Sequence, residues 1–571
     1  MSNRKSIIST FFIINFVGLF VFNAGCTSGN IENGQIGAAP KEPVVNPVAI
    51  ETSLPTQTPT IEPTQQAEIP FWFSPAIPAG IENKVILNQV IREVSTEKEA
   101  HLSLIPISEN MLENVVITTD WIYALVSPFS TITDGVTSVE IEKAWRGEKI
   151  KAFSGNPLLI SEITLQAFET NWGKPSDKGV KVIAEDELLD EAWKNQPAWA
   201  IVPFEKLEPR WKVLTVDGLS PLDMTIDIKK YPLTLQFGFT GKQEILSKIL
   251  EDPDGLVTIP STNCDPEKMT TLVMTGTTAL ARGTAERMET MGVNFPGEKI
   301  RSWLKDADLT HISNEIPFSK KCPAAVPVRN DWNFCSDPKY INLLEFIGAD
   351  IIELTGNHVM DWGKSDFLFT LGLYTENHFL TYGGGENLDD ARKALLVEDH
   401  GNKLAFIGCT PPGPAYAWAT DESPGNASCD RDWMVSEIKR LTALGYQVIV
   451  TFQHIEVYDY APVPPQRGDF QRMAEAGAII VSGSQSHFPQ GLGFYKGQFL
   501  HYGLGNLFFD QMDEPVMGTR REFIDRHVFY DGRYISTELL TAMLEDHAQP
   551  RPMTSIERQA LLRDAFKAST W

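Results

Sequence analysis

Positive charge is scarce in this sequence. Its 571 residues hold 49 Lys and Arg against 74 Asp and Glu, which gives a formal net charge of −25. Nucleic-acid binding needs clustered Lys and Arg, so this balance argues against DNA or RNA as a partner. It favours an acidic protein that is not drawn to anionic surfaces.

The apolar run near the N-terminus is too short for a comfortable membrane span. It reads "IISTFFIINFVGLFVF", with Arg4 and Lys5 before it and "NAGC", ending at Cys26, after it. This order of features indicates an export signal. Residues 1–26 resemble a bacterial lipoprotein signal, whose cysteine is lipidated, although Asn23 stands where that pattern has an aliphatic residue. The alternative is an uncleaved anchor. Both interpretations tie the chain to the membrane and place the rest of it outside the cytoplasm.

A tether follows the signal. Residues 27–69 are rich in Pro, Thr, Gln and Glu. Such a segment cannot bury enough apolar surface to fold, and its prolines keep it extended. We therefore expect a disordered linker that spaces the folded part from the membrane.

Closely spaced cysteine pairs, which would favour a zinc site, are missing. Export makes disulfides chemically allowed. We predict the bridges Cys322–Cys335 and Cys409–Cys429, because each pair is close in sequence and brackets a Pro-rich or Gly-rich loop. Cys264 is then left over as a free thiol.

The first folded region, 70–250, alternates strand-like runs such as "GVKVIAE" and "AWAIVPF" with helix-like runs such as "SVEIEKAWRGE". This alternation predicts an α/β domain. The stretch "WIYALVSPFSTITDGVTSVEIEKAWRGE" and the segment from "AWAIVPF" to "YPLT" resemble the phosphate-type solute-binding fold. The resemblance assigns no ligand residues, so a module that only packs or recognises a partner remains as open as a working solute binder.

The second region, 265–571, is a series of apolar runs that end in small and polar residues. Buried strands read as continuous apolar runs, and α/β sites gather at their carboxyl ends. One polar strand end could be a capped turn, but six in one domain indicate a shared crevice. These ends are Thr277, Glu315, Asn357–His358, Gln453–Glu456, Gln485–His487 and Asn506.

Five stretches of this region resemble blocks of the CapA-type family, named for capsule and poly-gamma-glutamate synthesis. "SNEIPF" is similar to its Asn-Leu-Glu-x-Pro block, and "GNHVMDWG" to its Asn-Asn-His…Asp-x-Gly block. "YGGGENLDDAR", "SGSQSHFPQG" and "HYGLGNLFFDQ" fit the other three, in the family's order. That family has a calcineurin-like metallophosphoesterase fold. The resemblance therefore implies a four-layer α/β/β/α sandwich over 265–571, preceded by the smaller α/β domain.

The resemblance also implies a site. The metal positions, for one divalent ion of unknown identity, are Glu315, Asn357 and His487. The catalytic positions are His358 as general acid, Asp361 and Glu456. The substrate-binding positions are Arg282, Arg392, Gln485 and Asn506, with the two arginines as candidates for a locally basic crevice.

Three positions depart from the family pattern. Thr277, Phe452 and Gln485 stand where the family has metal ligands. Thr and Gln offer a neutral oxygen and Phe offers none, whereas divalent ions prefer anionic oxygen or imidazole. His454 cannot take the place of Phe452, because two residues along a strand displace a ligand by roughly 6–7 Å. We therefore expect at most one metal.

Two functions fit these observations. The first is a non-catalytic surface component of capsule or poly-gamma-glutamate handling, whose partners are an envelope polymer or its synthesis machinery. The second is an active metal-dependent hydrolase that acts on such a polymer or its precursor. Each residue alone also has a structural role open to it: Asn357 as a helix cap, Glu315 in an ion pair and His358 in a turn.

Overall fold

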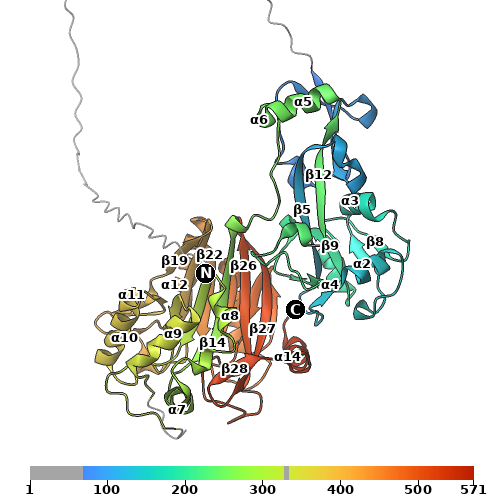
Figure 1. The fold of residues 1–571 in the computed structure, drawn as a ribbon. Coiled ribbons are helices and arrows are strands. Elements are labelled where there is room, and N and C mark those ends of the chain that lie inside the picture. Colours follow the sequence, from blue (N-terminus) through green and yellow to red (C-terminus); the bar gives the residue numbers. More distant parts are fainter. Residues whose placement is uncertain (1–67, 327–333) are drawn as a thin grey trace, which may run out of the picture. The chain divides into compact units, whose positions relative to one another are not determined.

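The structure, a computed structural model, describes residues 68–326 and 334–571 (Figure 1). The predicted export signal, the lipidation position Cys26 and nearly all of the predicted linker lie outside the described residues. Within the described part of the chain, no helix is both long enough and apolar enough to cross a bilayer.

The N-terminal region is built on one mixed sheet of nine strands. Its long central strand β5 (Val116–Pro128) pairs with β12 (Thr234–Gly241), β9 (Ala200–Pro203) and β10 (Trp211–Val213). The other strands are β1 (Ile69–Phe73), β3 (Ile91–Glu93), β4 (Leu102–Ile107), β7 (Leu158–Ile160) and β8 (Val180–Val182). Its longer helices are α2 (Ser138–Trp145), α3 (Glu162–Trp172), α4 (Leu188–Lys194) and α5 (Gln243–Glu251). The predicted α/β alternation is confirmed.

Two further sheets form the C-terminal region. The first has seven strands in the order β17 (Leu380–Tyr382), β16 (Ile351–Glu353), β15 (Leu309–Asn314), β14 (Met269–Thr278), β26 (Arg521–Tyr530), β27 (Arg533–Glu545) and β28 (Gln549–Pro552). The second has six, in the order β19 (Leu395–Asp399), β20 (Asn402–Cys409), β22 (Gln447–Gln453), β23 (Ala478–Ser484), β25 (Gln498–His501) and β24 (Leu492–Tyr495).

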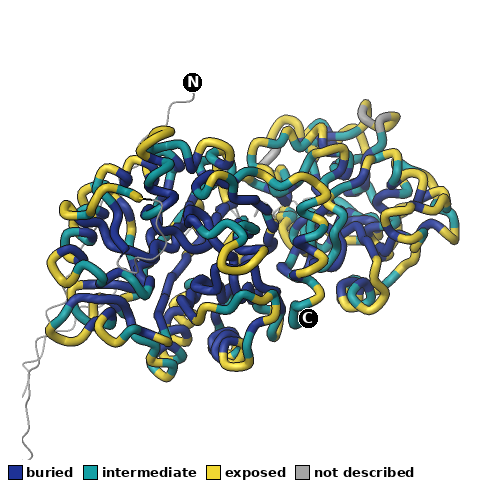
Figure 2. The backbone as a smooth tube through the Cα atoms, turned by 90° about the horizontal axis from the view of Figure 1, so that it is seen from below, coloured by how far each residue is buried: buried dark blue, intermediate teal, exposed yellow. Residues whose placement is uncertain are grey.

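Strand alternation places the two sheets face to face. Leu272 and Phe406, from different sheets, share one apolar core, whereas Val273 packs toward the helices outside the first sheet. Those helices are α7 (Arg282–Met291), α8 (Arg301–Lys305), α9 (Ile341–Ile347) and α10 (Lys364–Glu376). The helices α11 (Leu388–Arg392), α12 (Arg431–Ala443) and α13 (Pro464–Ala476) cover the second sheet. The predicted α/β/β/α sandwich is therefore confirmed, and its strands form the buried interior in Figure 2.

Parallel strands at the centre of both sheets position the site. Strands β14, β15 and β16 run parallel to one another, as do β20, β22 and β23. The carboxyl ends of each set therefore meet at one edge of their sheet, where α/β proteins build their sites.

Two disulfide bonds close loops at this end of the sandwich. Disulfides join Cys322 to Cys335 and Cys409 to Cys429, as predicted from the sequence. Cys264 is buried and unbonded to another cysteine.

Candidate functional site

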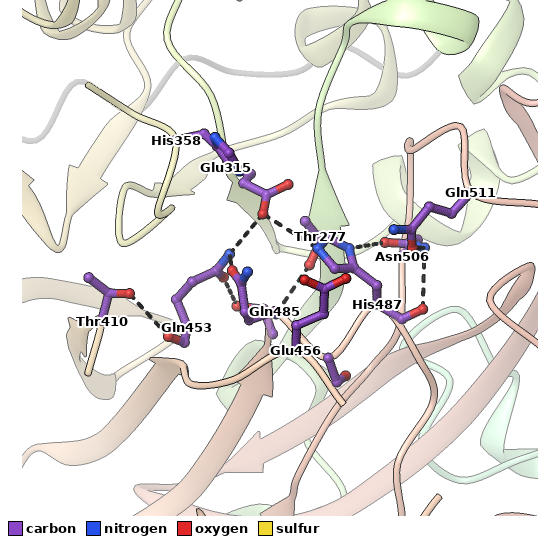
Figure 3. Close-up of polar contacts among 12 residues, drawn as sticks. Thr277, Glu315, His358, Thr410, Gln453, Glu456, Gln485, His487, Asn506 and Gln511 are labelled. Atoms are coloured by element: carbon purple, nitrogen blue, oxygen red, sulfur yellow. Dashed lines mark hydrogen bonds and ion pairs between the residues drawn. The ribbon is translucent and has the colours of Figure 1, made fainter. Parts of the chain in front are cut away.

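Polar side chains from both sheets meet in one group, which we call the strand-end cluster (Figure 3). Thr277 belongs to the end of β14, Glu315 follows β15, and Gln453 ends β22. All three are at most 2% exposed. The cluster consists of Thr277, Glu315, His358, Gln453, Gln485, His487 and Asn506, and Asn357 directly precedes His358 in the chain. Residues separated by more than 200 positions are thus brought together, as the pattern of polar strand ends predicted.

Glu315 is the central anion of the cluster. Its Oε1 lies 3.6 Å from Nε2 of His487 and accepts a hydrogen bond from Nε2 of Gln453 at 3.4 Å. Burial raises the pKa of Glu315, but the nearby charges of His487, His358 and Arg282 lower it, and the net shift is downward. Glu315 is therefore an anion at neutral pH.

His487 is held with one ring nitrogen facing Glu315. Its Nδ1 lies 2.9 Å from Oδ1 of Asn506, which makes Nδ1 the donor and leaves Nε2 toward the carboxylate. Asn506 is itself fixed, because its amide nitrogen donates to the carbonyl of Thr519 at 3.2 Å. Burial lowers the pKa of His487, but Glu315 and Asn506 raise it, and the net shift is upward. An imidazole oriented through its second nitrogen is typical of metal ligands.

Two backbone angles show that this loop is constrained. Gln485 and His487 have φ values of +73° and +49°. Residues other than glycine rarely adopt this left-handed region, and such strain concentrates at functional sites.

His358 is oriented in the same way by Asp361. Its Nδ1 lies 2.8 Å from Oδ2 of Asp361. Burial lowers the pKa of His358, but Asp361 and the charge of Glu315 raise it, and the net shift is upward. The side chain is 20% exposed, so the ring reaches solvent. A histidine with a raised pKa that also touches solvent is suited to general acid chemistry.

The sequence-based placement of Phe452 at a ligand position is wrong by one residue. Phe452 is fully buried on the helix side of the second sheet, where its ring stacks on Phe470 at 5.3 Å. His454 lies on that same side and contacts Asp469 at 3.1 Å. Because neighbouring strand residues face opposite ways, Gln453 is the side chain that enters the cluster. Period-two alternation in "TFQHIE" was the signal that could have identified it.

The amide of Gln453 links the cluster internally. It donates to Oε1 of Gln485 as well as to Glu315, and its own oxygen accepts from the hydroxyl of Ser484. The backbone N–H of Gln485 in turn lies 3.4 Å from Oγ1 of Thr277. Neutral groups therefore satisfy one another across this half of the cluster.

Arg282 lies beside the cluster. It forms an ion pair with Asp510, and its guanidinium sits 4.6 Å from the ring centre of Phe334 and 5.3 Å from that of Phe509. These two rings in turn contact His358 and His487. Arg282 also has a φ of +47°.

The prediction that Arg392 belongs to the substrate-binding site is wrong. Its guanidinium contacts Asp430 at 3.5 Å and the ring of Trp433 at 5.5 Å, both in the helical layer outside the second sheet. No contact between Arg392 and the strand-end cluster occurs among the described residues. A position in the family block "ENLDDAR" does not specify the direction in which the side chain points. The sequence-based prediction therefore placed Arg392 in the site.

Glu456 is exposed and lies beside Gln485 and His487 in the view of Figure 3. It accepts a hydrogen bond from the hydroxyl of Tyr458, and its charge contributes to the raised pKa of His487.

The ligand chemistry of Glu315 and His487, whose ligand atoms lie 3.6 Å apart, suits one divalent ion, and Asn357 is a third candidate ligand beside them in the chain. Two oxygen atoms here are buried without a hydrogen-bond partner, Oε2 of Glu315 and Oδ1 of Asn357. With Nε2 of His487 they offer a carboxylate, an amide oxygen and an imidazole, which are ordinary ligands for such ions. A second ion does not fit as well, because Thr277 and Gln485 offer neutral oxygens and the amide of Gln453 is already engaged.

Another group with metal-ligand chemistry lies at the opposite edge of the sheets. Ligand atoms of Asp308, Asp399 and His400 lie within 4.8 Å of one another. Asp308 already accepts from Thr271, and Asp399 from Thr270 and His400. These groups are therefore satisfied by the protein itself.

Comparison with solved structures gives distant likenesses. The calcineurin-like phosphoesterase YfkN from Bacillus subtilis is 12% identical, with a TM-score of 0.28, and the match covers 52% of this chain and 98% of that one. A putative phosphate ABC transporter substrate-binding protein from Clostridium perfringens is 13% identical with a TM-score of 0.25, over 33% of this chain and 94% of that one. Likenesses of this size settle no activity, and the solute-binding resemblance of 70–250 stays a prediction.

Comparison of sequences is more specific for the C-terminal region. The chain is 26% identical over 333 residues to the capsule biosynthesis protein CapA of Bacillus anthracis, which covers 55% of this chain and 77% of that protein. It is 30% identical over 176 residues to the PGA biosynthesis protein CapA of Bacillus subtilis (strain 168), over 30% of this chain and 45% of that protein. Residues 271–511 match the model of the bacterial capsule synthesis protein family PGA_cap. The resemblance predicted from five motifs is therefore confirmed: residues 271–511 of this chain are similar to the PGA_cap family and to CapA proteins.

Proposed function

We propose that this protein is an extracytoplasmic component of the synthesis or export of a capsule or poly-gamma-glutamate-type polymer. A lipid on Cys26, or an uncleaved N-terminal anchor, would hold it at the membrane. Its partners would be the polymer or the machinery that makes it. The observation that carries the proposal is that motif residues matching this family meet in one buried cluster, although they come from distant parts of the chain.

The chemistry of the cluster favours binding over two-metal catalysis. A two-metal phosphoesterase site needs ligands on both sides of the reacting group. Here Gln453 and Gln485 bond to each other where a second ion would need anionic or imidazole ligands. The solvent-reaching ring of His358, whose pKa is raised, and the guanidinium of Arg282 instead provide donors for an anionic group, such as a carboxylate.

The test is a deletion with complementation in the native host. We expect deletion of the gene to abolish polymer on the cell surface, and the wild-type gene to restore it. A gene carrying Glu315→Ala and His487→Ala should not restore it, provided that immunoblotting finds the variant at wild-type level. Arg392→Ala, outside the cluster, should restore it and is the matched control. Unchanged polymer in the deletion strain would overturn the proposal.

A specific observation also favours a second candidate, an active metal-dependent hydrolase. Oε2 of Glu315 and Oδ1 of Asn357 are buried without partners, as a metal site requires. A divalent ion bound there would polarise a substrate oxygen and lower the pKa of a bound water. His358, held by Asp361, would donate a proton to the leaving group. Turnover of a simple aryl phosphodiester by the purified protein, lost in His358→Ala but kept in Arg392→Ala, would establish this candidate. No turnover with any divalent ion would reject it.

A further inference from the structure

We propose that Tyr416 and Phe334 are positioning residues for His358, acting through Asp361, and that the two disulfides hold the loops that carry them. The proposal rests on the proposed function in one respect, that His358 belongs to a working site. Phe334 and Tyr416 lie in loops outside the family motifs quoted above.

Asp361 collects three donors from three separate segments. Its Oδ2 accepts from Nδ1 of His358 at 2.8 Å and from the backbone N–H of Phe334 at 3.0 Å. Its Oδ1 accepts from the hydroxyl of Tyr416 at 3.2 Å. Both oxygens are therefore engaged, and the Asp361 side chain is 3% exposed. A carboxylate fixed at both oxygens fixes the direction in which it holds the histidine ring.

Phe334 adds a packing contact to this hydrogen bond. Its ring meets the ring of His358 edge to face, with centroids 4.5 Å apart and an interplanar angle of 88°. The guanidinium of Arg282 lies over the same Phe334 ring. Cys335 is the next residue, so the disulfide to Cys322 anchors the backbone that donates to Asp361.

Tyr416 differs from a core tyrosine. It is 62% exposed and joins none of the apolar cores of the described residues, yet its hydroxyl reaches Asp361. Its loop is closed by the Cys409–Cys429 disulfide and by a backbone hydrogen bond from Thr410 to Ala427 at 3.0 Å. An exposed ring whose polar tip points inward contributes little to packing, so orientation of Asp361 is the role that its geometry supports.

The experiment measures the ring of His358 directly. Purified full-length protein is treated with diethyl pyrocarbonate at one fixed pH, and modification of each histidine is followed by mass spectrometry. The variants are Tyr416→Phe, which removes only the hydroxyl, and Cys409→Ala/Cys429→Ala. The matched control is Tyr446→Phe, which precedes β22 at the opposite edge of the sheet. His378, which is exposed, serves as the internal reference in every digest.

We expect Tyr416→Phe to raise the modification rate of His358 roughly three- to tenfold, the size expected when one hydrogen bond of ordinary strength is lost. Tyr446→Phe should leave it unchanged. The Cys409→Ala/Cys429→Ala variant should raise the modification rate of His358 by the same factor. Adding Tyr416→Phe to that variant should not change the rate further, because both changes act through one contact. An unchanged rate in Tyr416→Phe, or additive effects, would overturn the proposal.

The outcomes separate this proposal from the proposed function. A raised rate together with normal surface polymer in the Glu315→Ala/His487→Ala strain would reject the function and keep the positioning role. An unchanged rate together with loss of polymer in that strain would reject the positioning role alone.

Discussion

Nε2 of His487 lies 3.6 Å from Oε1 of Glu315, and both side chains are almost completely buried. Each group makes the charged form of the other more favourable, which lowers the pKa of Glu315 and raises that of His487. A buried charge without a partner lowers the free energy of unfolding, so each member of the pair depends on the other for its stability.

This pair predicts a pH window for stability. The lowered pKa of Glu315 contributes stability that is present above its ordinary value of 4.5 and is lost as pH falls through the folded value. The raised pKa of His487 contributes stability that is present below its ordinary value of 6.5 and is lost as pH rises through the folded value. Chemical denaturation across pH should therefore show a local maximum from the pair. Glu315→Gln/His487→Gln should flatten that maximum, and an unaltered profile in this variant would contradict the assignment.

Removing one partner should cost more than removing both. Glu315→Ala leaves His487 buried without its anion, and we expect a loss of about 3–5 kcal/mol in the free energy of unfolding. The double variant Glu315→Gln/His487→Gln should lose less, because no charge is left unpaired. Urea denaturation of the three proteins measures this. Equal losses in both variants would mean that the pair is not coupled.

The position of Gln453 predicts a gain of function. Gln453→His with Gln485→His places imidazoles where the cluster has amides, so this variant should bind an additional divalent ion. Phe452→His is the matched control on the same strand. Its side chain faces the helices, so it should bind no extra metal and should lower stability by about 3 kcal/mol through lost packing. Isothermal titration with Mn²⁺ checks both. Extra metal bound by Phe452→His would show that Phe452, and not Gln453, occupies the position of the family's metal ligand.

The disulfides should each stabilise the fold. Both close short loops, and we expect each to contribute about 2–4 kcal/mol. Cys322→Ala/Cys335→Ala and Cys409→Ala/Cys429→Ala should each unfold at lower denaturant concentration. Cys264→Ala, a buried cysteine outside both bridges, is the control for loss of a thiol alone. Peptide mapping that finds either pair as free thiols in protein purified without reductant would count against the bridges.

Anchoring is tested at the N-terminus. If Cys26 is lipidated, the native protein begins with a lipid-modified cysteine and partitions with membranes. Cys26→Ala should release it or leave its signal uncleaved. Mass spectrometry of the native N-terminus measures this, and an intact, unlipidated signal would reject the lipoprotein interpretation.

The sandwich could be predicted from the sequence because its strands are continuous apolar runs with polar ends. Parallel pairing then brings residues such as Glu315 and Gln485 to one edge, whatever the loops between them do. The order of the motifs predicted the resemblance to the PGA_cap family, and close spacing in the sequence predicted the two disulfide pairs.

The direction in which individual side chains point could not be predicted from the sequence. Phe452 and Gln453 are neighbours, and a shift of one residue exchanges the helix-facing side chain for the cluster-facing one. Arg392 was assigned by its place in a motif, although its partners lie in the helical layer. Tyr416 belongs to a loop without periodicity, so only the fold reveals that its hydroxyl meets Asp361.

The most direct measurement of the central claim is the metal content of the purified protein. The account holds that the strand-end cluster offers one complete donor set, from Glu315, Asn357 and His487, and that Gln453 and Gln485 fill the place of a second. Elemental analysis after exhaustive dialysis should therefore find at most one divalent ion per chain, lost in Glu315→Ala/His487→Ala and kept in Arg392→Ala. Two tightly held ions per wild-type chain, together with phosphodiester turnover that disappears in His358→Ala, would contradict it.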